Sequence, residues 1–307
     1  MAEPLGLRAE AIEWVNMASD GGRFPLEVSH IDDFQFRGEA FSLRGQQGIR
    51  KPAKFDAALT VQTNLPKKGR EHPYEDSIGE DGLPRYSWRG DDPDQFENVG
   101  LRVAMRQHLP IIWFWQISKS PSKYNVIAPV YVIGEEVERK RFVLAPLPDD
   151  NLAGDIDEYS GHEEVTRRYL LSQTKRRLHQ PVFRSQVLDA YNNMCAVCSL
   201  AHPQLLDAAH IIDDSDEHGI ASVVNGLALC KIHHAAYDKF FMGIRPDYVI
   251  ELRPDLLTEK DGPILEFGMQ ALHGKKLSNL PRSKSLRPSS DRLQAKFDLF
   301  TRGSKIG

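Results

Sequence analysis

Every cysteine of this 307-residue chain lies in one short stretch, and their spacing is that of metal ligands. Cys195 and Cys198 form a C-x-x-C pair that can bind one ion from a tight turn, and Cys230 and His233 offer the same spacing from a second turn. Three thiolates and one imidazole are a common tetrahedral ligand set for structural zinc, whereas an odd number of cysteines does not describe a disulfide framework. We therefore expect these four residues to hold a structural Zn²⁺. The alternative is two buried thiols beside an exposed histidine.

A second group of polar residues lies among these ligands and just after them. His210 ends an apolar, strand-like run, and Asn225 begins a short turn that leads into a helical stretch at 227–241. His234 and Asp238 are four residues apart on that helix, so both lie on one face and could share a metal ion. Phosphodiester hydrolysis needs a base with a pKa near neutrality and a cation that stabilises the charge developing on the phosphate. These residue types could supply both.

The segment that carries these residues contains AAHII at 208–212, NGLALC at 225–230 and HHAAYD at 233–238. It closely resembles the HNH, or ββα-metal, endonuclease superfamily. The resemblance implies that His210 is the general base and that Asn225 orients it. It also implies that His234 and Asp238 bind a catalytic divalent ion, Mg²⁺ or Mn²⁺, although Co²⁺ or Ni²⁺ also suits such ligands.

The chain departs from the HNH pattern at one position. Many members carry a further metal ligand directly before the catalytic histidine, where this chain has Ala209. Asp207 has the same strand parity as Ala209 and is our candidate for the third ligand of the catalytic ion, with a hydrogen bond to the backbone as the alternative. Asp213 and Asp214 are expected to belong to a solvated acidic loop.

The elements that must position these residues divide the chain into three parts. Residues 1–147 are rich in β-type runs, with strands expected at 57–63, 109–117, 125–134 and 140–146 after an opening helix at 10–18. Residues 148–180 begin with an acidic stretch without apolar periodicity and are expected to form a linker and helix. Residues 181–307 are the expected zinc-containing nuclease domain with a basic C-terminal tail. The expected fold class is therefore α+β, in two domains.

Residues 1–147 carry further motifs: GIRKP at 48–52 followed by AALTVQT, PYEDSIGEDG at 73–82, RYSWRG at 85–90 and DQFENVGLRVAM at 94–105. In this order they resemble the SET-and-RING-associated (SRA) domain, a PUA-like β-barrel that flips a modified cytosine into a pocket and stacks it between aromatic rings. The resemblance implies that Tyr74 and Tyr86 stack the base and that Asp76 and Ser87 contact its edge. Trp88 replaces a glycine of the SRA pattern. The alternative is that both tyrosines only pack a loop against the barrel.

The composition is 41% hydrophobic and 27% charged, which is typical of a soluble globular protein. No apolar run approaches the roughly 20 residues of a membrane span, and the N-terminus lacks a signal-peptide core, so we expect a cytoplasmic protein. The net charge is −4, yet residues 271–307 contain nine Lys or Arg and two Asp. Such a segment can neutralise DNA phosphates, although a solvated tail has the same composition. Lys51, Arg89 and Lys239 are our candidates for contacts with the DNA backbone.

Together these features predict a modification-dependent, type IV-like restriction endonuclease. An SRA-like domain would detect 5-methyl- or 5-hydroxymethylcytosine in double-stranded DNA by base flipping, and an HNH domain would cut nearby. Cutting both strands requires two active sites, so we expect a homodimer, at least on DNA. Two alternatives stay open: a non-catalytic, zinc-containing DNA-binding or regulatory protein, and an HNH nuclease whose N-terminal domain binds unmodified DNA or a protein.

Overall fold

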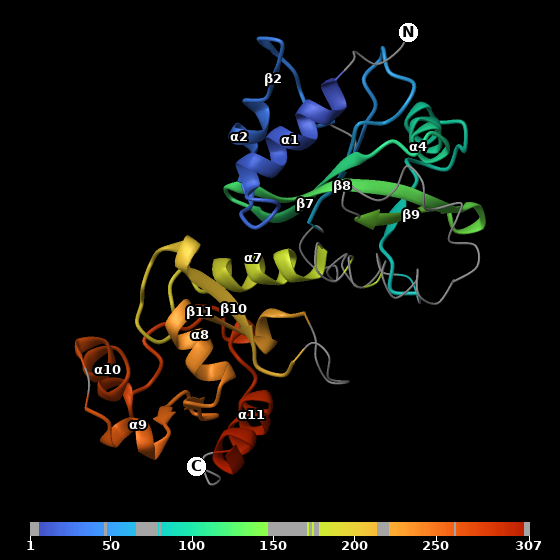
Figure 1. The fold of residues 1–307 in the computed structure, drawn as a ribbon. Helices are drawn as coiled ribbons and strands as arrows, with labels where there is room; N and C mark the ends of the chain where they lie inside the picture. Colours follow the sequence, from blue (N-terminus) through green and yellow to red (C-terminus); the bar gives the residue numbers. More distant parts are fainter. Residues whose placement is uncertain are drawn as a thin grey trace, which may run out of the picture. The chain divides into compact units, whose positions relative to one another are not determined.

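The chain folds into two compact units, Met1–Val182 and Phe183–Gly307, in a computed structural model (Figure 1). Tyr74, Asp76 and the expected linker at 148–161 lie outside the residues that the structure describes. Within the described part of the chain, no helix is long and apolar enough to cross a membrane. The described residues are 6–45, 48–65, 79, 81–146, 171, 174, 178–213, 221–260 and 262–303.

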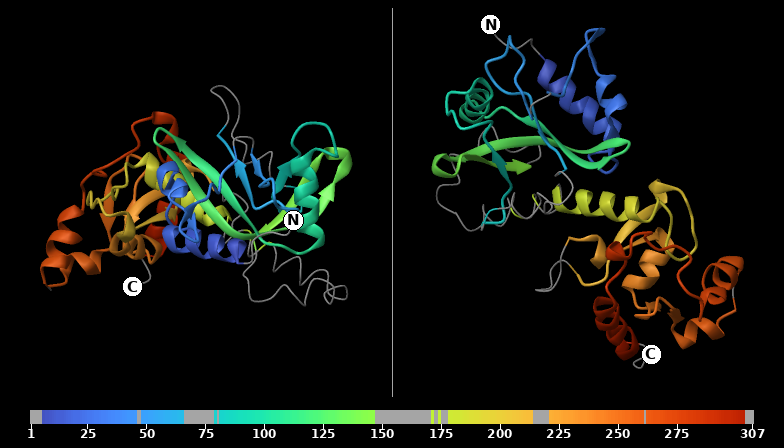
Figure 2. Two further views of the ribbon diagram at one scale, coloured as in Figure 1. Left: turned by 90° about the horizontal axis from the view of Figure 1, so that it is seen from above. Right: turned by 180° about the vertical axis from the view of Figure 1, so that it is seen from behind.

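A curved sheet forms the centre of the first unit (Figure 2). Its strand order is β4–β5–β7–β8–β9–β6, with β1 paired to β8 beside this path; β5 and β7 run parallel and the other pairs antiparallel. Each of the four runs expected to be strands overlaps one of β5, β7, β8 and β9. The strands are β1 (Leu26–Glu27), β4 (Ile49–Arg50), β5 (Thr60–Thr63), β6 (Arg85–Ser87), β7 (Ile111–Lys119), β8 (Ser122–Glu136) and β9 (Arg141–Pro146), and a separate hairpin pairs β2 (Gln35–Phe36) with β3 (Glu39–Ala40).

Strand β7 is buried on both faces, which explains its unbroken run of apolar residues. Ile112 and Phe114 lie in a core with α1 (Leu7–Ser19) and α2 (Val28–Asp32). Trp113 and Trp115 lie in a second core with α4 (Phe96–Arg106). Because successive side chains of a strand point to opposite faces, helices on both sides require apolar residues at every position. A short 3₁₀ helix, η1 (Val137–Arg139), joins β8 to β9.

The two ends of this sheet approach each other. Strand β6 ends the strand order on one side and β4 and β5 lie on the other, yet the Tyr86 hydroxyl donates a hydrogen bond of 3.1 Å to the Gln62 carbonyl of β5. A Cβ added at Gly48, directly before β4, would lie 3.0 Å from the same hydroxyl. The described strands therefore form a half-barrel, and they do not show the closed PUA/SRA-like barrel expected from the sequence.

The second unit contains the order strand, strand, helix. β10 (Leu206–His210) and β11 (Gly226–Cys230) form an antiparallel hairpin, and α8 (Lys231–Asp238) follows directly. α7 (Gln180–Ala190) precedes the hairpin in the chain and has Pro181 as its second residue. The other elements are η5 (Pro203–Leu205), η6 (Val223–Asn225), β12 (Met242–Ile244), β13 (Ile250–Leu252), α9 (Pro254–Thr258), α10 (Pro263–Gly268), η7 (Gln270–Leu272), η8 (Lys284–Leu286) and α11 (Ser290–Gly303).

Candidate functional site

The four predicted zinc ligands lie together, with donor atoms that are all within 4.8 Å of one another. The Nδ1 atom of His233 lies 3.1 Å from the Cys230 sulfur and 3.7 Å from the Cys195 sulfur, and the Cys198 and Cys230 sulfurs are 4.0 Å apart. Ideal tetrahedral bonds of about 2.3 Å to sulfur and 2.0 Å to nitrogen would separate the donor atoms by roughly 3.5–3.8 Å. The cluster therefore fits a zinc ion.

Two further contacts show how the fold prepares this cluster for a cation. The Nε2–H of His233 donates a hydrogen bond of 2.9 Å to the Gly268 carbonyl, which turns Nδ1 toward the sulfurs. Hydrogen bonds from the Cys195 and Cys198 thiols hold the pKa of Cys230 far below its usual value, although burial opposes this. Three cysteine sulfurs and one imidazole nitrogen at these distances are a donor set that matches the chemistry of Zn²⁺.

His210 lies at the end of β10, opposite Gly226, and its ring stacks on Phe183 of α7. The ring centroids are 4.0 Å apart and the planes differ by 14°. This contact depends on Gly226, because a Cβ added there would overlap the Cγ2 atom of Val187 and lie 2.9 Å from Cζ of Phe183. The missing side chain lets α7 approach the hairpin closely enough for Phe183 to lie under His210. Sequence reasoning did not find Phe183, since no spacing rule links it to His210.

Asn225 fixes the chain directly after His210. Its side-chain oxygen accepts the Ile212 N–H and its amide donates to the Ile212 carbonyl, both at 2.9 Å. Its backbone carbonyl also accepts the Ile211 N–H at 2.9 Å. The Asn225 side chain is completely buried. One asparagine thus satisfies the backbone of the two residues that follow His210.

His234 contacts both carboxylates that were predicted to share a metal with it, but through opposite ring nitrogens. Nδ1 lies 3.3 Å from Asp207 and Nε2 lies 3.1 Å from Asp238. Hydrogen bonds to Asp207 and Asp238 raise the pKa of His234 to about 9 against the effect of burial. The hydrogen bond with His234, together with the charge and hydrogen bond of Lys231 at 2.6 Å, holds the pKa of Asp207 well below its usual value.

The three residues His234, Asp238 and Asp207 therefore do not converge on one point. Within the described residues, the cysteine cluster is the one group of three or more potential ligands with all donor atoms within 4.8 Å. Ala209 is fully buried in the apolar core, so a ligand at that position would need a different local packing. Lys231 was not predicted, although its place three residues before His234 on one helix could have indicated it.

In the first unit, Tyr86 and Ser87 lie on edge strand β6. Burial raises the pKa of Tyr86 despite its hydrogen bond to the Gln62 carbonyl. The Tyr86 ring meets Trp113 edge-to-face at 6.5 Å, and the Ser87 side chain is exposed. The contacts of Tyr86 in the free protein are thus those of a packed residue at the point where the two ends of the sheet meet. Tyr74 and Asp76 lie outside the described residues.

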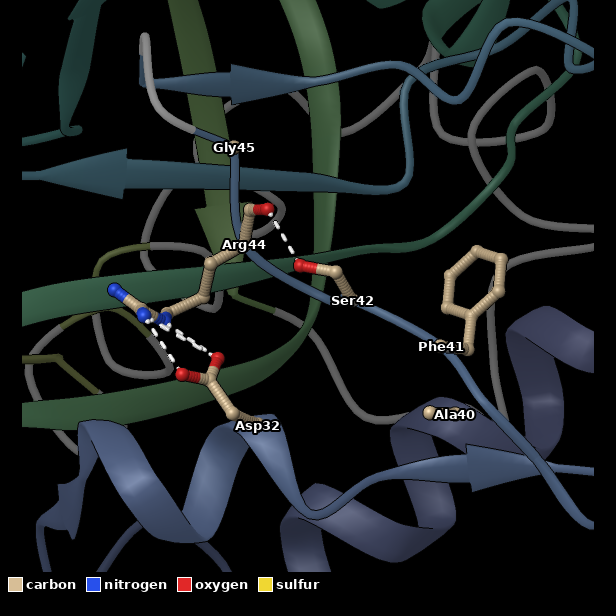
Figure 3. Close-up of a pocket in the computed structure, with 6 residues that line it drawn as sticks. All are labelled: Asp32, Ala40, Phe41, Ser42, Arg44 and Gly45. Carbon is tan, nitrogen blue, oxygen red and sulfur yellow. Dashed lines mark hydrogen bonds and ion pairs between the residues drawn. The ribbon is translucent and has the colours of Figure 1, made fainter.

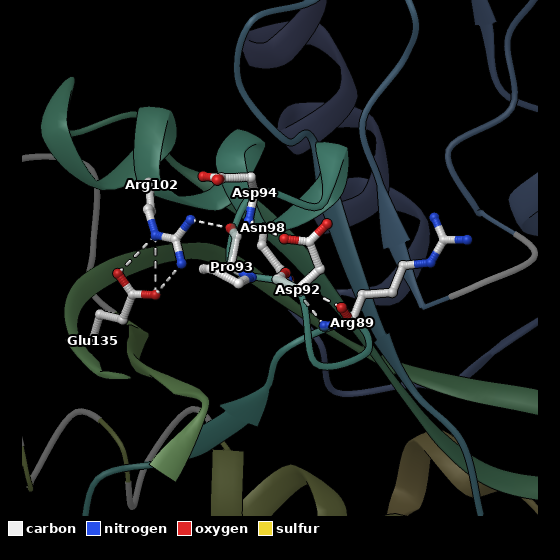
Figure 4. Close-up of polar contacts among 7 residues, drawn as sticks. All are labelled: Arg89, Asp92, Pro93, Asp94, Asn98, Arg102 and Glu135. Atoms are coloured by element: carbon white, nitrogen blue, oxygen red, sulfur yellow. Dashed lines mark hydrogen bonds and ion pairs between the residues drawn. The ribbon is translucent and has the colours of Figure 1, made fainter. Parts of the chain in front are cut away.

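The three predicted DNA-backbone cations differ in their surroundings. The Lys51 ammonium lies 3.5 Å from the Phe96 ring centroid, and Arg89 forms an ion pair with Glu97. The loop that carries Arg89 is fixed by Asn98, whose amide donates to the Arg89 carbonyl at 3.0 Å (Figure 4). Lys239 is exposed directly after α8. Lys239 thus lies in the second unit with its side chain open to solvent, whereas Lys51 and Arg89 have partners within the first unit.

The first unit also contains a cavity of about 440 Å³, shown in Figure 3. Its polar lining is dominated by Arg44, whose guanidinium binds both carboxylate oxygens of Asp32 at 3.2 Å. Neither Tyr86 nor Ser87 lines it, so this cavity is separate from the predicted base pocket. The other residues that line it are Ala40, Phe41, Ser42 and Gly45.

Comparison with known proteins finds a similarity that lies within the second unit. The family model described as HNH endonuclease matches residues 195–245, which contain all four predicted zinc ligands together with His210, Asn225, His234 and Asp238. A solved structure, the modification-dependent TagI restriction endonuclease, is 17% identical, with 82% of this chain and 84% of that chain covered and a TM-score of 0.29. No curated protein matches the sequence.

Proposed function

We propose that this chain, in which residues 195–245 match the HNH endonuclease family, is a restriction enzyme that hydrolyses double-stranded DNA carrying a modified cytosine. The observation that carries the nuclease part is the constraint on His210. Its ring is stacked on Phe183, and Asn225 holds both residues that follow it. A non-catalytic zinc module needs neither feature, whereas a general base must be oriented before the substrate arrives.

In this proposal His210 accepts the proton of the attacking water. Histidine suits this step because its pKa lies near neutral pH. The stacking contact with Phe183 fixes the plane of the His210 ring. Asn225 acts on His210 through the backbone and is a positioning residue.

His234 is the proposed ligand of the catalytic divalent ion, and the two carboxylates have different roles. Asp207 is already neutralised by Lys231, so it orients His234 by accepting the Nδ1–H. Asp238 lies on the Nε2 side with its side chain 48% exposed, and can share the ion with His234. The bound ion, Mg²⁺ or Mn²⁺, supplies Lewis-acid stabilisation of the charge that develops on the phosphate. This assignment revises the sequence-based role of Asp207 from ligand to orienting residue.

The first unit is the proposed reader of the modified base. The support is the ordered series of SRA-like motifs together with the half-barrel, in which Tyr86 lies where the two sheet ends meet. Tyr74 and Tyr86 would stack a flipped 5-methyl- or 5-hydroxymethylcytosine while Asp76 and Ser87 contact its edge. Two copies of the chain would act together when both strands are cut.

The experiment is cleavage of matched plasmid DNAs that are unmodified, 5-methylcytosine-containing or 5-hydroxymethylcytosine-containing, each with Mg²⁺ or Mn²⁺ and with chelator. Metal-dependent cutting of a modified DNA alone is the expected result. Equal cutting of all three DNAs would retain the nuclease and reject the modified-base reader. Cutting that persists in chelator would reject the metal-dependent mechanism.

A further inference from the structure

The C-terminal helix α11 packs on the HNH domain, although it lies 45 or more residues beyond the end of the family match at residue 245. Figure 1 shows α11 beside α8 in the second unit. Its Phe300 ring covers Gly243 of β12, where an added Cβ would lie 2.6 Å from a ring carbon. The close contact fixes α11 against the strand that follows α8.

This packing brings Lys296 to the candidate active site. Its ammonium lies 5.3 Å from the ring centroid of Tyr237 and 5.1 Å from that of Phe240, the residues on either side of Asp238 and Lys239. Lys296 therefore lies beside the end of α8 that carries Asp238.

The cation is held by aromatic rings and not by a carboxylate. Among the described residues, no carboxylate oxygen lies within 4.0 Å of the Lys296 ammonium. Two arginines of the second unit are paired with carboxylates instead, Arg245 with Glu251 and Arg253 with Asp255. Cation–π contact leaves the N–H donors of an ammonium free for a further acceptor.

The same C-terminal segment also contacts η6. The N–H of Ser289 donates to the Val224 carbonyl at 3.0 Å, so the turn that contains η8 packs against η6, which contains Asn225. The exposed side chains of Arg282 and Lys284 belong to this turn. Positive charge thus lies beside the loop that holds His210 and beside the helix that holds His234.

We propose that the C-terminal segment 282–296 forms the phosphate-binding wall of the nuclease site, with Lys296 contacting the DNA phosphate beside His234 and Asp238. The inference rests on the proposed nuclease function and deepens it. A phosphate is the acceptor whose charge and hydrogen-bonding capacity match an ammonium held next to a metal-binding carboxylate. The competing role for Lys296 is to pack α11 against Tyr237 and Phe240 without touching DNA.

The test compares Lys296→Met, which keeps much of the apolar stem, with Lys296→Arg and with Lys275→Met, an exposed lysine outside the segment. DNA affinity is measured at several salt concentrations with each of these substitutions combined with His210→Ala. Single-turnover cleavage is measured with each substitution alone in the full chain. One lost phosphate contact lowers the slope of log Kd against log salt by about 0.9. We expect that change in slope for Lys296→Met, together with cleavage slowed on the order of 10- to 100-fold. Lys296→Arg should recover both the slope and the cleavage rate. Lys275→Met should cleave at the unchanged rate.

A Lys296→Met variant with the wild-type salt slope and cleavage rate but a lower Tm would overturn the proposal in favour of packing. Arg282→Met with Lys284→Met extends the test, because the wall predicts a further fall in the slope, and an unchanged slope would reject that part of it. If the unaltered chain cuts no DNA, the proposed function fails on its own. The binding measurement still decides whether Lys296 contacts phosphate.

Discussion

Replacing Gly226 by alanine tests whether close packing under His210 matters for both stability and catalysis. The backbone at Gly226 has φ −128° and ψ 147°, which alanine adopts without strain, so any effect comes from the added methyl group. That methyl group would overlap Val187 and lie 2.9 Å from the Phe183 ring, which must then move away from His210. Overpacking of this kind costs about 1–3 kcal/mol.

For a unit of this size, each kcal/mol lowers Tm by roughly 2–8 °C, so we expect the transition of the second unit to fall by about 5–10 °C. A displaced general base should slow single-turnover cleavage on the order of 10- to 100-fold even below the new Tm. The matched control is Gly262→Ala, because a Cβ there meets no atom within 4 Å. The measurements are thermal unfolding and single-turnover cleavage on one modified duplex.

A second substitution makes this test specific. Adding Val187→Ala removes the nearest obstacle to the new methyl group, so the double variant should recover part of both Tm and rate relative to Gly226→Ala. The reasoning is refuted if Gly226→Ala matches Gly262→Ala in Tm and rate. Loss of Tm without loss of rate would retain the packing argument and reject the role of Phe183 in orienting His210.

Three further predictions concern other parts of the chain. Cys198→Ser should abolish zinc binding and unfold the second unit, since structural zinc contributes about 10–16 kcal/mol of binding free energy. Metal analysis and circular dichroism measure both effects, and a variant that stays folded without zinc would contradict the prediction. Tyr86→Ala should erase the preference for modified over plain DNA, whereas Tyr86→Phe should retain it because the stacking ring is kept. The measurement is competition binding, and an unchanged ratio of the two affinities in Tyr86→Ala would contradict the prediction. Hydrogen bonds to Arg141 and Arg85 hold the pKa of Glu136 below its usual 4.5, although burial opposes them. Because the pKa of Glu136 is lower in the folded than in the unfolded chain, its ionised carboxylate stabilises the fold above pH 4.5. That stabilisation is lost as the pH falls through the pKa of the folded state. Glu136→Gln should therefore lower stability at neutral pH more than at pH 3, and equal losses in denaturant titrations at both pH values would oppose it.

The clustering of three cysteines with His233 and the ββα order could be predicted because both depend on local sequence. Cys230 and His233 are three residues apart at the start of one helix, so their geometry is set by that helix. The β-rich character of residues 1–147 was likewise visible in runs such as 109–117, where residues 111–115 are all apolar because both faces of β7 are covered there.

The contacts that orient the candidate site could not be predicted, because they join residues distant in sequence. Phe183 reaches His210 from α7, and Lys296 reaches Tyr237 from α11. Asp207 contacts Nδ1 of His234, but strand parity does not tell which ring nitrogen a carboxylate meets. The pairing of Asp207 with Nδ1 and Asp238 with Nε2 follows only from the packing of α8 on the hairpin.

The most direct test of the nuclease site is single-turnover cleavage of a modified duplex by the full chain and by His210→Ala, with DNA affinity measured in parallel. We predict that His210→Ala loses cleavage by at least about 100-fold while its affinity for DNA and its zinc content stay at the level of the unaltered chain. Cleavage by His210→Ala at an undiminished rate would contradict the assignment of His210 as the general base, and with it the arrangement of the site proposed for this chain.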